Sequence, residues 1–69
     1  MERVQVSSTN VAAIGYDPTT LTLEIEFTNG SIYQYFDVPQ SLYDELVSGP
    51  SVGKAVNTLV KQNYRFAKQ

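Results

Sequence analysis

Hydrophobic and polar side chains alternate most clearly over residues 21–28, and this period of two predicts a strand with one buried face. An apolar stretch over 11–17 precedes it, and a β-branched and aromatic stretch over 31–38 follows it. A shorter alternation at Val4 and Val6 is compatible with the start of one more strand. The pattern predicts a three-stranded antiparallel β-meander formed by residues 11–17, 21–28 and 31–38.

From residue 39 onward the apolar side chains recur every three to four positions, which predicts two amphipathic helices. The first is expected over 39–48, because Pro39 suits a helix start and Gly49–Pro50 suits a helix stop. The second is expected over 51–63, with Ser51 as its N-cap. We therefore predict an α+β fold in which both helices pack on one face of the sheet. The expected core consists of Leu23, Ile25, Phe27, Leu46, Val56, Leu59 and Val60.

The hairpin loop around Asn29–Gly30 decides on which face of the sheet Tyr33 and Tyr35 lie. A two-residue loop would place both tyrosines on the polar face, opposite Glu24 and Glu26. A three-residue loop with a bulge would place them in the core, because a shift of one residue moves every side chain of a strand to the other face. We favour the core register, since a small domain needs bulky core residues.

The composition excludes most catalytic chemistry. The 69 residues include no cysteine and no histidine, so disulfides, thiolate sites, zinc fingers and imidazole bases are ruled out. Glu24 and Glu26 share a strand face, but without supporting ligands such a pair is typical of a solvent-exposed face. We therefore predict no catalytic residue, no cofactor and no metal site.

The sequence also bears on where the protein acts. No apolar run approaches the roughly 20 residues that span a bilayer, and the N-terminus lacks the regions of a signal peptide. We expect a single domain over 1–69 that is cytoplasmic and makes no contact with a membrane.

Charge is divided unevenly along the chain. Residues 1–50 carry all seven acidic side chains and one basic side chain, a net charge of −6, whereas residues 51–69 carry four basic side chains and no acid, a net charge of +4. These four would lie within roughly 60° of one another on a helix that continued to the chain end. They are Lys54, Lys61, Arg65 and Lys68. Such a ridge would attract phosphates, and an ordinary solvated helix face is the alternative interpretation.

The segment Ser51–Lys54 combines a serine, a glycine and a lysine at the expected start of the second helix. Free backbone N–H groups there could bind an anion, with Gly53 permitting close approach and Lys54 supplying charge. The alternative is an ordinary serine cap, with Gly53 making room for packing.

The order of short motifs over residues 4–66 resembles the KTSC domain. The matching segments are Val6-Ser7-Ser8, Ile14-Gly15-Tyr16-Asp17, Leu23-x-Ile25-x-Phe27-x-Asn29-Gly30, Tyr33-Gln34-Tyr35, Val38-Pro39, Ser51-x-Gly53-Lys54 and Asn57. The resemblance implies a small domain that occurs at the C-terminus of some lysyl-tRNA synthetases and as a free-standing bacterial protein. It also implies RNA binding as a suggested role, with no established activity.

We therefore predict a non-catalytic binding domain whose leading ligand class is RNA. The candidate phosphate contacts are Ser51, Gly53, Lys54, Asn57, Lys61 and Arg65, and the motif aromatics are Tyr33, Tyr35 and Tyr64. An exposed ring, Tyr64 or Phe66, would contact a base.

The alternative is a protein-interaction module that binds a partner or a second copy through a sheet edge or an exposed patch at Phe36 and Tyr43. The isoelectric point of about 4.7 favours this alternative, because dedicated RNA-binding domains are usually basic.

Overall fold

The computed structural model describes residues 2–49, 52–60 and 63–69. Its strands are β1 (Arg3–Gln5), β2 (Val11–Asp17), β3 (Thr22–Phe27), β4 (Ile32–Tyr35) and β5 (Phe66–Lys68). Its helical segments are α1 (Gln40–Ser48) and α2 (Val52–Ala55), and a π-helical segment, η1 (Val56–Val60), continues directly from α2. None of the helices in these three ranges is long and apolar enough to cross a membrane.

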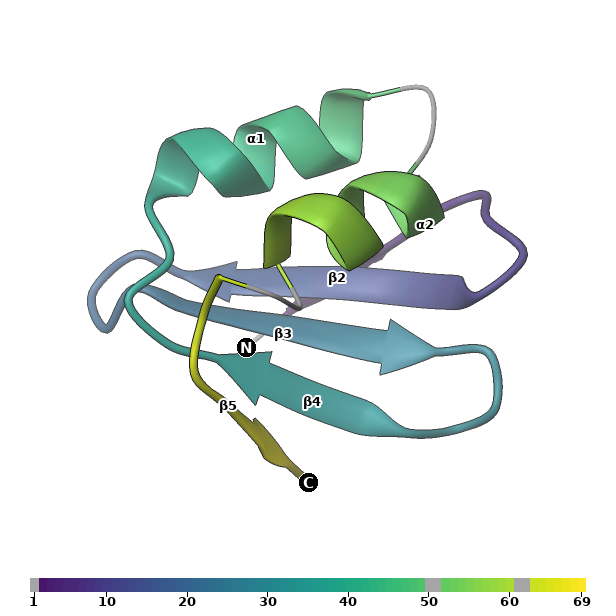
Figure 1. Ribbon diagram of the computed structural model, residues 1–69, viewed down its shortest axis with the longest axis horizontal. Coiled ribbons are helices and arrows are strands. Elements are labelled where there is room, and N and C mark those ends of the chain that lie inside the picture. Colours follow the sequence, from purple (N-terminus) through teal and green to yellow (C-terminus); the bar gives the residue numbers. More distant parts are fainter. Residues whose placement is uncertain (1, 50–51, 61–62) are drawn as a thin grey trace.

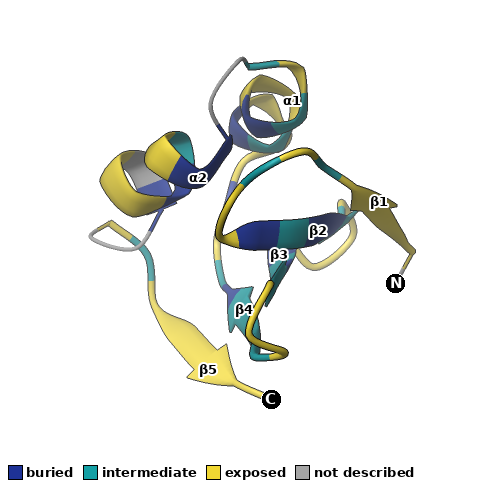
Figure 2. Ribbon diagram, turned by 90° about the vertical axis from the view of Figure 1, so that its right-hand side faces the viewer, coloured by how far each residue is buried: buried dark blue, intermediate teal, exposed yellow. Residues whose placement is uncertain are grey.

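The strands form one antiparallel sheet in the order β1-β2-β3-β4-β5 (Figure 1). Both helices lie in the chain between β4 and β5, and both cover the same face of the sheet (Figure 2). The predicted α+β class and the antiparallel meander are confirmed. The prediction of three strands is wrong, because short edge strands, β1 and β5, extend the sheet on either side.

The loop between β3 and β4 has the three-residue form. The Phe27 N–H donates to the Ser31 carbonyl (2.8 Å) and the Gly30 N–H donates to the Phe27 carbonyl (3.0 Å), so residues 28–30 form the loop. Gly30 has a φ of +92°, the left-handed region that a glycine adopts without steric cost and that this loop type requires. The resulting register places Tyr33 opposite Ile25 and Tyr35 opposite Leu23. The core-facing register is confirmed.

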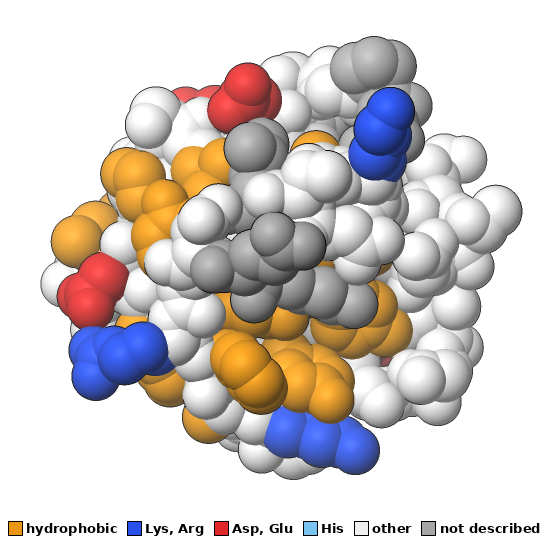
Figure 3. Space-filling model, viewed as in Figure 1, with side chains coloured by type: hydrophobic (Ala, Val, Ile, Leu, Met, Phe, Trp, Pro, Cys, Tyr) orange, Lys and Arg blue, Asp and Glu red, His pale blue; other side chains and the backbone are white. Residues whose placement is uncertain are grey.

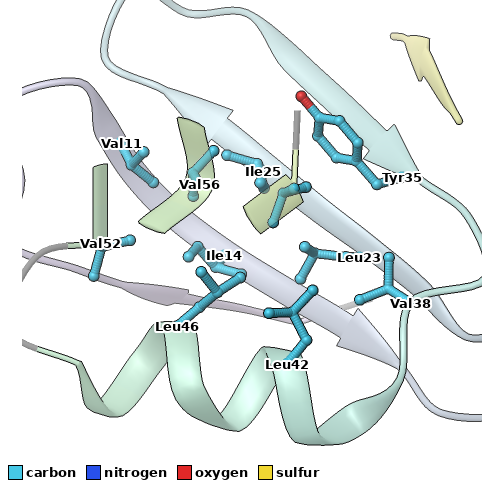
Figure 4. Close-up of a cluster of buried hydrophobic side chains, with 11 residues drawn as sticks. Val11, Ile14, Leu23, Ile25, Tyr35, Val38, Leu42, Leu46, Val52 and Val56 are labelled. Carbon is cyan, nitrogen blue, oxygen red and sulfur yellow. The ribbon is translucent and has the colours of Figure 1, made fainter. Parts of the chain in front are cut away.

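The core lies between the helices and the covered face of the sheet (Figure 4). Five predicted core residues are buried there: Leu23, Ile25, Leu46, Val56 and Val60. Ile14 and Val38 join them with no exposed surface. Phe27 packs only at the margin, because it is the last residue of β3, and the side chain of Leu59 lies outside the described part of the chain. A small, continuous apolar core therefore holds the helices to the strands.

The described part of the second helix runs from Val52 to Val60, and the remaining predicted positions 51, 61 and 62 lie outside the described residues. Asn63 already lies in a turn, and its N–H donates to the Val60 carbonyl (3.2 Å). The tail then pairs with β4: the Phe36 N–H donates to the Arg65 carbonyl (3.0 Å) and the Gln69 N–H to the Ile32 carbonyl (2.7 Å). The otherwise unpaired edge of β4 thus forms backbone hydrogen bonds with the tail. A helix that continued past the core would have no such tertiary contacts to stabilise it.

Candidate functional site

The predicted basic ridge does not exist among the described residues. Lys54 is exposed on α2, whereas Arg65 lies beyond the end of η1 and Lys68 lies in β5. Arg65 instead forms an ion pair with Asp37, at 3.1 Å between Nη2 and Oδ2. The prediction fails because Asn63 lies in a turn and Phe66–Lys68 form a strand, so no helix aligns Arg65 and Lys68 with Lys54. Ser51 and Lys61, the remaining members of the predicted phosphate site, lie outside the described residues.

Three of the predicted phosphate contacts do meet, in a polar pocket of about 470 Å³ beside α2. Its walls are the loop between β1 and β2 and the exposed face of the helix. The lining residues are Ser7, Ser8, Thr9, Asn10, Val52, Gly53, Lys54 and Asn57. None of the described lining residues carries a carboxylate, and their hydroxyls, amides and one ammonium group can hydrogen-bond an anion.

Gly53 determines how closely α2 approaches this loop. A Cβ atom at residue 53 would stand 2.9 Å from Ser8 Oγ and 3.1 Å from Asn10 Oδ1, both closer than an ordinary contact. The glycine therefore brings the helix against the loop, as the packing interpretation of this residue requires. The same close approach forms the floor of the polar pocket.

A second and larger hollow, the aromatic groove, has a volume of about 540 Å³ and lies along β3, β4, β5 and the β3–β4 loop. Its lining residues are Asn10, Phe27, Thr28, Asn29, Ser31, Tyr33, Tyr35 and Phe66. Four aromatic rings, from three strands, form its apolar part. Figure 3 shows hydrophobic side chains exposed on this face of the molecule, with basic side chains at its margins.

The rings of the aromatic groove contact one another closely. The Tyr33 ring centroid lies 5.6 Å from that of Phe27 in an edge-to-face arrangement and 5.7 Å from that of Phe66. Tyr35 lies 5.8 Å from Phe66. These separations are typical of stabilising aromatic pairs. The ring positions are therefore set by mutual packing, so the groove is largely preformed.

Exposure differs sharply among these rings. Tyr35 is only 2% exposed, and burial raises the pKa of its hydroxyl, with a smaller contribution from Tyr33. Tyr33 is half-buried, whereas Phe66 is 56% exposed and is the ring most accessible to a ligand. Tyr64, the other aromatic residue proposed to contact a base, packs against the core and does not line the aromatic groove.

Hydrogen-bonding groups surround the apolar floor of the groove. The Asn29 Oδ1 atom accepts from the Ser31 N–H (3.0 Å), and the Asn10 Oδ1 atom accepts from the Thr9 hydroxyl (2.8 Å). With their carbonyl oxygens engaged in this way, both asparagines retain an amide NH₂ group that can donate. Lys68 pairs with Tyr33 across the strands, so its side chain projects from the same face of the sheet.

The acidic side chains of β3 lie on the opposite face of the sheet. Glu24 and Glu26 alternate with the core residues of the strand, and both carboxylates interact with Arg3, at 3.5 Å and 3.6 Å. The core-facing register therefore separates these carboxylates from the tyrosines. In the described part of the chain no cluster of three or more metal-binding side chains occurs.

Phe36 and Tyr43, the two residues of the patch proposed for protein binding, are both half-buried. Tyr43 of α1 stacks on Tyr16 of β2, with ring centroids 5.2 Å apart, and is half-buried. Among the described large hydrophobic side chains Val4, Leu21 and Phe66 are exposed, and Phe66 is the most exposed of the three at 56%. The alternation of Tyr64, Phe66 and Lys68 with other residues was the available signal for a strand there.

Comparison with known proteins identifies the architecture. The chain is 35% identical to a KTSC domain protein from Yersinia pestis of known crystal structure, with a TM-score of 0.92 over 99% of this chain and 96% of that one. It is 37% identical to an uncharacterised protein of Stutzerimonas stutzeri, over 96% of this chain and 94% of the relative.

A segment of a much larger protein is also similar. The chain is 41% identical to part of a lysine–tRNA ligase from a Nostoc species, over 81% of this chain but only 10% of the ligase. The family model of the KTSC domain matches residues 7–64. The chain belongs to the KTSC domain family.

Proposed function

We propose that this domain is a non-catalytic, cytoplasmic module that binds single-stranded RNA, with an unpaired base held in the aromatic groove. The observation that carries the proposal is the exposed Phe66 ring standing beside Tyr33 over an apolar floor. Proteins that bind single strands use such rings because any base can stack on them, at a gain of about 1–3 kcal/mol per base.

The surroundings of the groove support this proposal. Lys68 lies on the same face of the sheet, and the carboxylates of β3 face away from the groove. Arg65 is ion-paired with Asp37, but both side chains are highly exposed, so the pair contributes little and the guanidinium can still attract a phosphate. Related segments in lysine–tRNA ligases, enzymes that act on tRNA, are consistent with an RNA ligand.

Binding is expected to be weak. The net charge of −2 opposes association with a polyanion, so we expect a micromolar or poorer dissociation constant at physiological salt. With two or three phosphate contacts to a single strand, the log–log salt slope should be near −1.5 to −2.

The test is fluorescence anisotropy of a labelled oligouridylate at low and moderate salt. Phe66→Ala should weaken binding about tenfold, because it removes the accessible stacking surface. Phe66→Leu should weaken binding nearly as much, since leucine retains apolar contact but offers no π face. Val4→Ala is the matched control: it truncates an exposed apolar side chain on the opposite edge strand and should leave affinity unchanged.

Two outcomes would contradict the proposal. The first is no binding at low salt, and the second is full affinity in Phe66→Ala. If Phe66→Ala abolished self-association in sedimentation experiments while no oligonucleotide bound, the domain would be a protein-interaction module that uses β5.

A further inference from the structure

The aromatic groove and the polar pocket share one lining residue, Asn10. We propose that the two hollows form one continuous track for single-stranded RNA, with a base in the groove and an adjoining phosphate in the polar pocket against Lys54. This inference rests on the proposed function and extends it from a base-stacking site to a site that also reads the backbone.

Two hydrogen bonds join the loops that line the two hollows. The Thr28 N–H donates to the Asn10 carbonyl (2.9 Å), and the Thr28 hydroxyl donates to the Thr9 carbonyl (3.2 Å). These bonds hold the β1–β2 loop, which lines the polar pocket, directly against the β3–β4 loop, which lines the groove. Asn10 therefore lies where the two hollows adjoin, which is why we place neighbouring parts of one ligand in them.

The groove is apolar and suits a base, whereas the polar pocket suits a phosphate. Aromatic rings line the groove, whereas the polar pocket presents hydroxyls, amides and the Lys54 ammonium group. Lys54 takes part in none of the ion pairs between described side chains, so its charge is not already neutralised. Lys54 lies in α2 and is exposed.

The hydroxyl and amide groups near Lys54 are set to donate. Ser8 Oγ accepts from the backbone N–H groups of Asn10 and Val11, both at 3.4 Å, so its own hydrogen remains available. The side-chain oxygen Oδ1 of Asn10 accepts from the Thr9 hydroxyl. The side-chain NH₂ group of Asn10 therefore remains as a donor where the two hollows adjoin. Donors with a single positive charge and no carboxylate suit a phosphate diester.

The test compares a ligand that lacks a phosphate with one that contains several. Uridine and tetrauridylate are titrated into ¹⁵N-labelled protein, and backbone amide shifts are followed by NMR. Uridine should shift amides around the groove, such as those of Asn29, Tyr33 and Phe66, and leave Gly53 and Lys54 unchanged. Tetrauridylate should shift both groups of amides, because its backbone enters the polar pocket.

Lys54→Gln separates local contact from overall charge. It should weaken tetrauridylate binding about threefold to tenfold at low salt and reduce the magnitude of the salt slope by about 0.7, the value for one phosphate contact on a single strand. It should leave uridine binding unchanged. Arg3→Gln is the control, because it removes the same charge from the opposite face of the sheet.

Three outcomes would overturn the track, and each has a different consequence. If tetrauridylate shifts only the groove amides, or if Lys54→Gln matches Arg3→Gln, the phosphate position is wrong and the groove remains the RNA site. If tetrauridylate shifts only the amides of the polar pocket, the base position in the groove is wrong and the phosphate position stands. If neither ligand shifts any of these amides, the proposed function itself fails.

Discussion

Tyr16 joins the sheet to the segment that leads into α1, and the hydrogen bond that it makes can be removed almost in isolation. Its hydroxyl donates to the carbonyl oxygen of Val38, at 2.5 Å, and Val38 has no exposed surface. Tyr16→Phe deletes this donor but keeps the ring, so the stacking on Tyr43 is preserved. The substitution therefore isolates one hydrogen bond between distant parts of the chain.

The expected cost follows from the position of the acceptor. A typical hydrogen bond contributes about 0.5–1.5 kcal/mol, and leaving a buried acceptor unpaired costs about 1–3 kcal/mol. Because Tyr16 is only half-buried, water can reach part of this site, and we expect a loss of about 1–2 kcal/mol. For a domain of this size each 1 kcal/mol corresponds to about 4–8 °C in Tm.

The Tyr16 hydroxyl should also make stability depend on alkaline pH. Burial raises its pKa above the ordinary value of 10.0, and the carboxylates of Asp17 and Asp44 raise it further. A group whose pKa is higher in the folded state contributes stability that is complete below the unfolded pKa and is lost as the pH rises toward the folded pKa. The native protein should therefore lose stability above about pH 10, and Tyr16→Phe should lose less.

Urea denaturation followed by circular dichroism, at neutral pH and above pH 10, measures both effects. Tyr43→Phe is the control, because it removes a hydroxyl from the stacked partner ring, and that hydroxyl makes no hydrogen bond to another described residue. A loss below about 0.5 kcal/mol for Tyr16→Phe, or an equal loss for the control, would refute the assigned role of this hydrogen bond.

Three further predictions test other parts of the fold and the site. Leu46→Ala, at a fully buried position in α1, should cost about 2–5 kcal/mol in urea denaturation, and a loss under 1 kcal/mol would mean that α1 is packed differently. Gly30→Ala should cost about 1–2 kcal/mol although its side chain would meet open space, because φ is +92° there; unchanged stability would contradict the three-residue loop. Asp37→Asn should tighten oligouridylate binding at low salt, since it frees Arg65 and an asparagine tolerates the positive φ of 60° at residue 37; weaker binding in anisotropy measurements would contradict a role for Arg65.

The local pattern of the sequence determined the central elements of this domain. Alternation over residues 21–28 produced β3, and the spacing of Leu42 and Leu46 produced α1 with nearly the predicted bounds. These elements follow from the sequence because their apolar residues recur with a single period, two in the strand and about 3.6 in the helix. Only the matching secondary structure places all of those residues on the core.

The tertiary structure decided the form of the β3–β4 loop and the conformation of the C-terminal segment, for which the local sequence allows more than one structure. Asn29–Gly30 suits a two-residue turn as well as a three-residue loop, and the loop was selected by the burial of Tyr35 against the core. Residues Phe66–Lys68 became a strand because β4 offered an unpaired edge, a feature that no local pattern contains.

The candidate site could not be predicted from the sequence, because it too depends on contacts between distant segments. The aromatic groove is assembled from β3, β4 and β5, so its existence depends on the pairing of the tail with β4. The predicted basic ridge required a helix that continued to the chain end, whereas Phe66–Lys68 form β5. Sequence patterns determine which residues face a core. A surface formed by two distant segments is determined only when the chain has folded, because the contacts that stabilise it join residues far apart in the sequence.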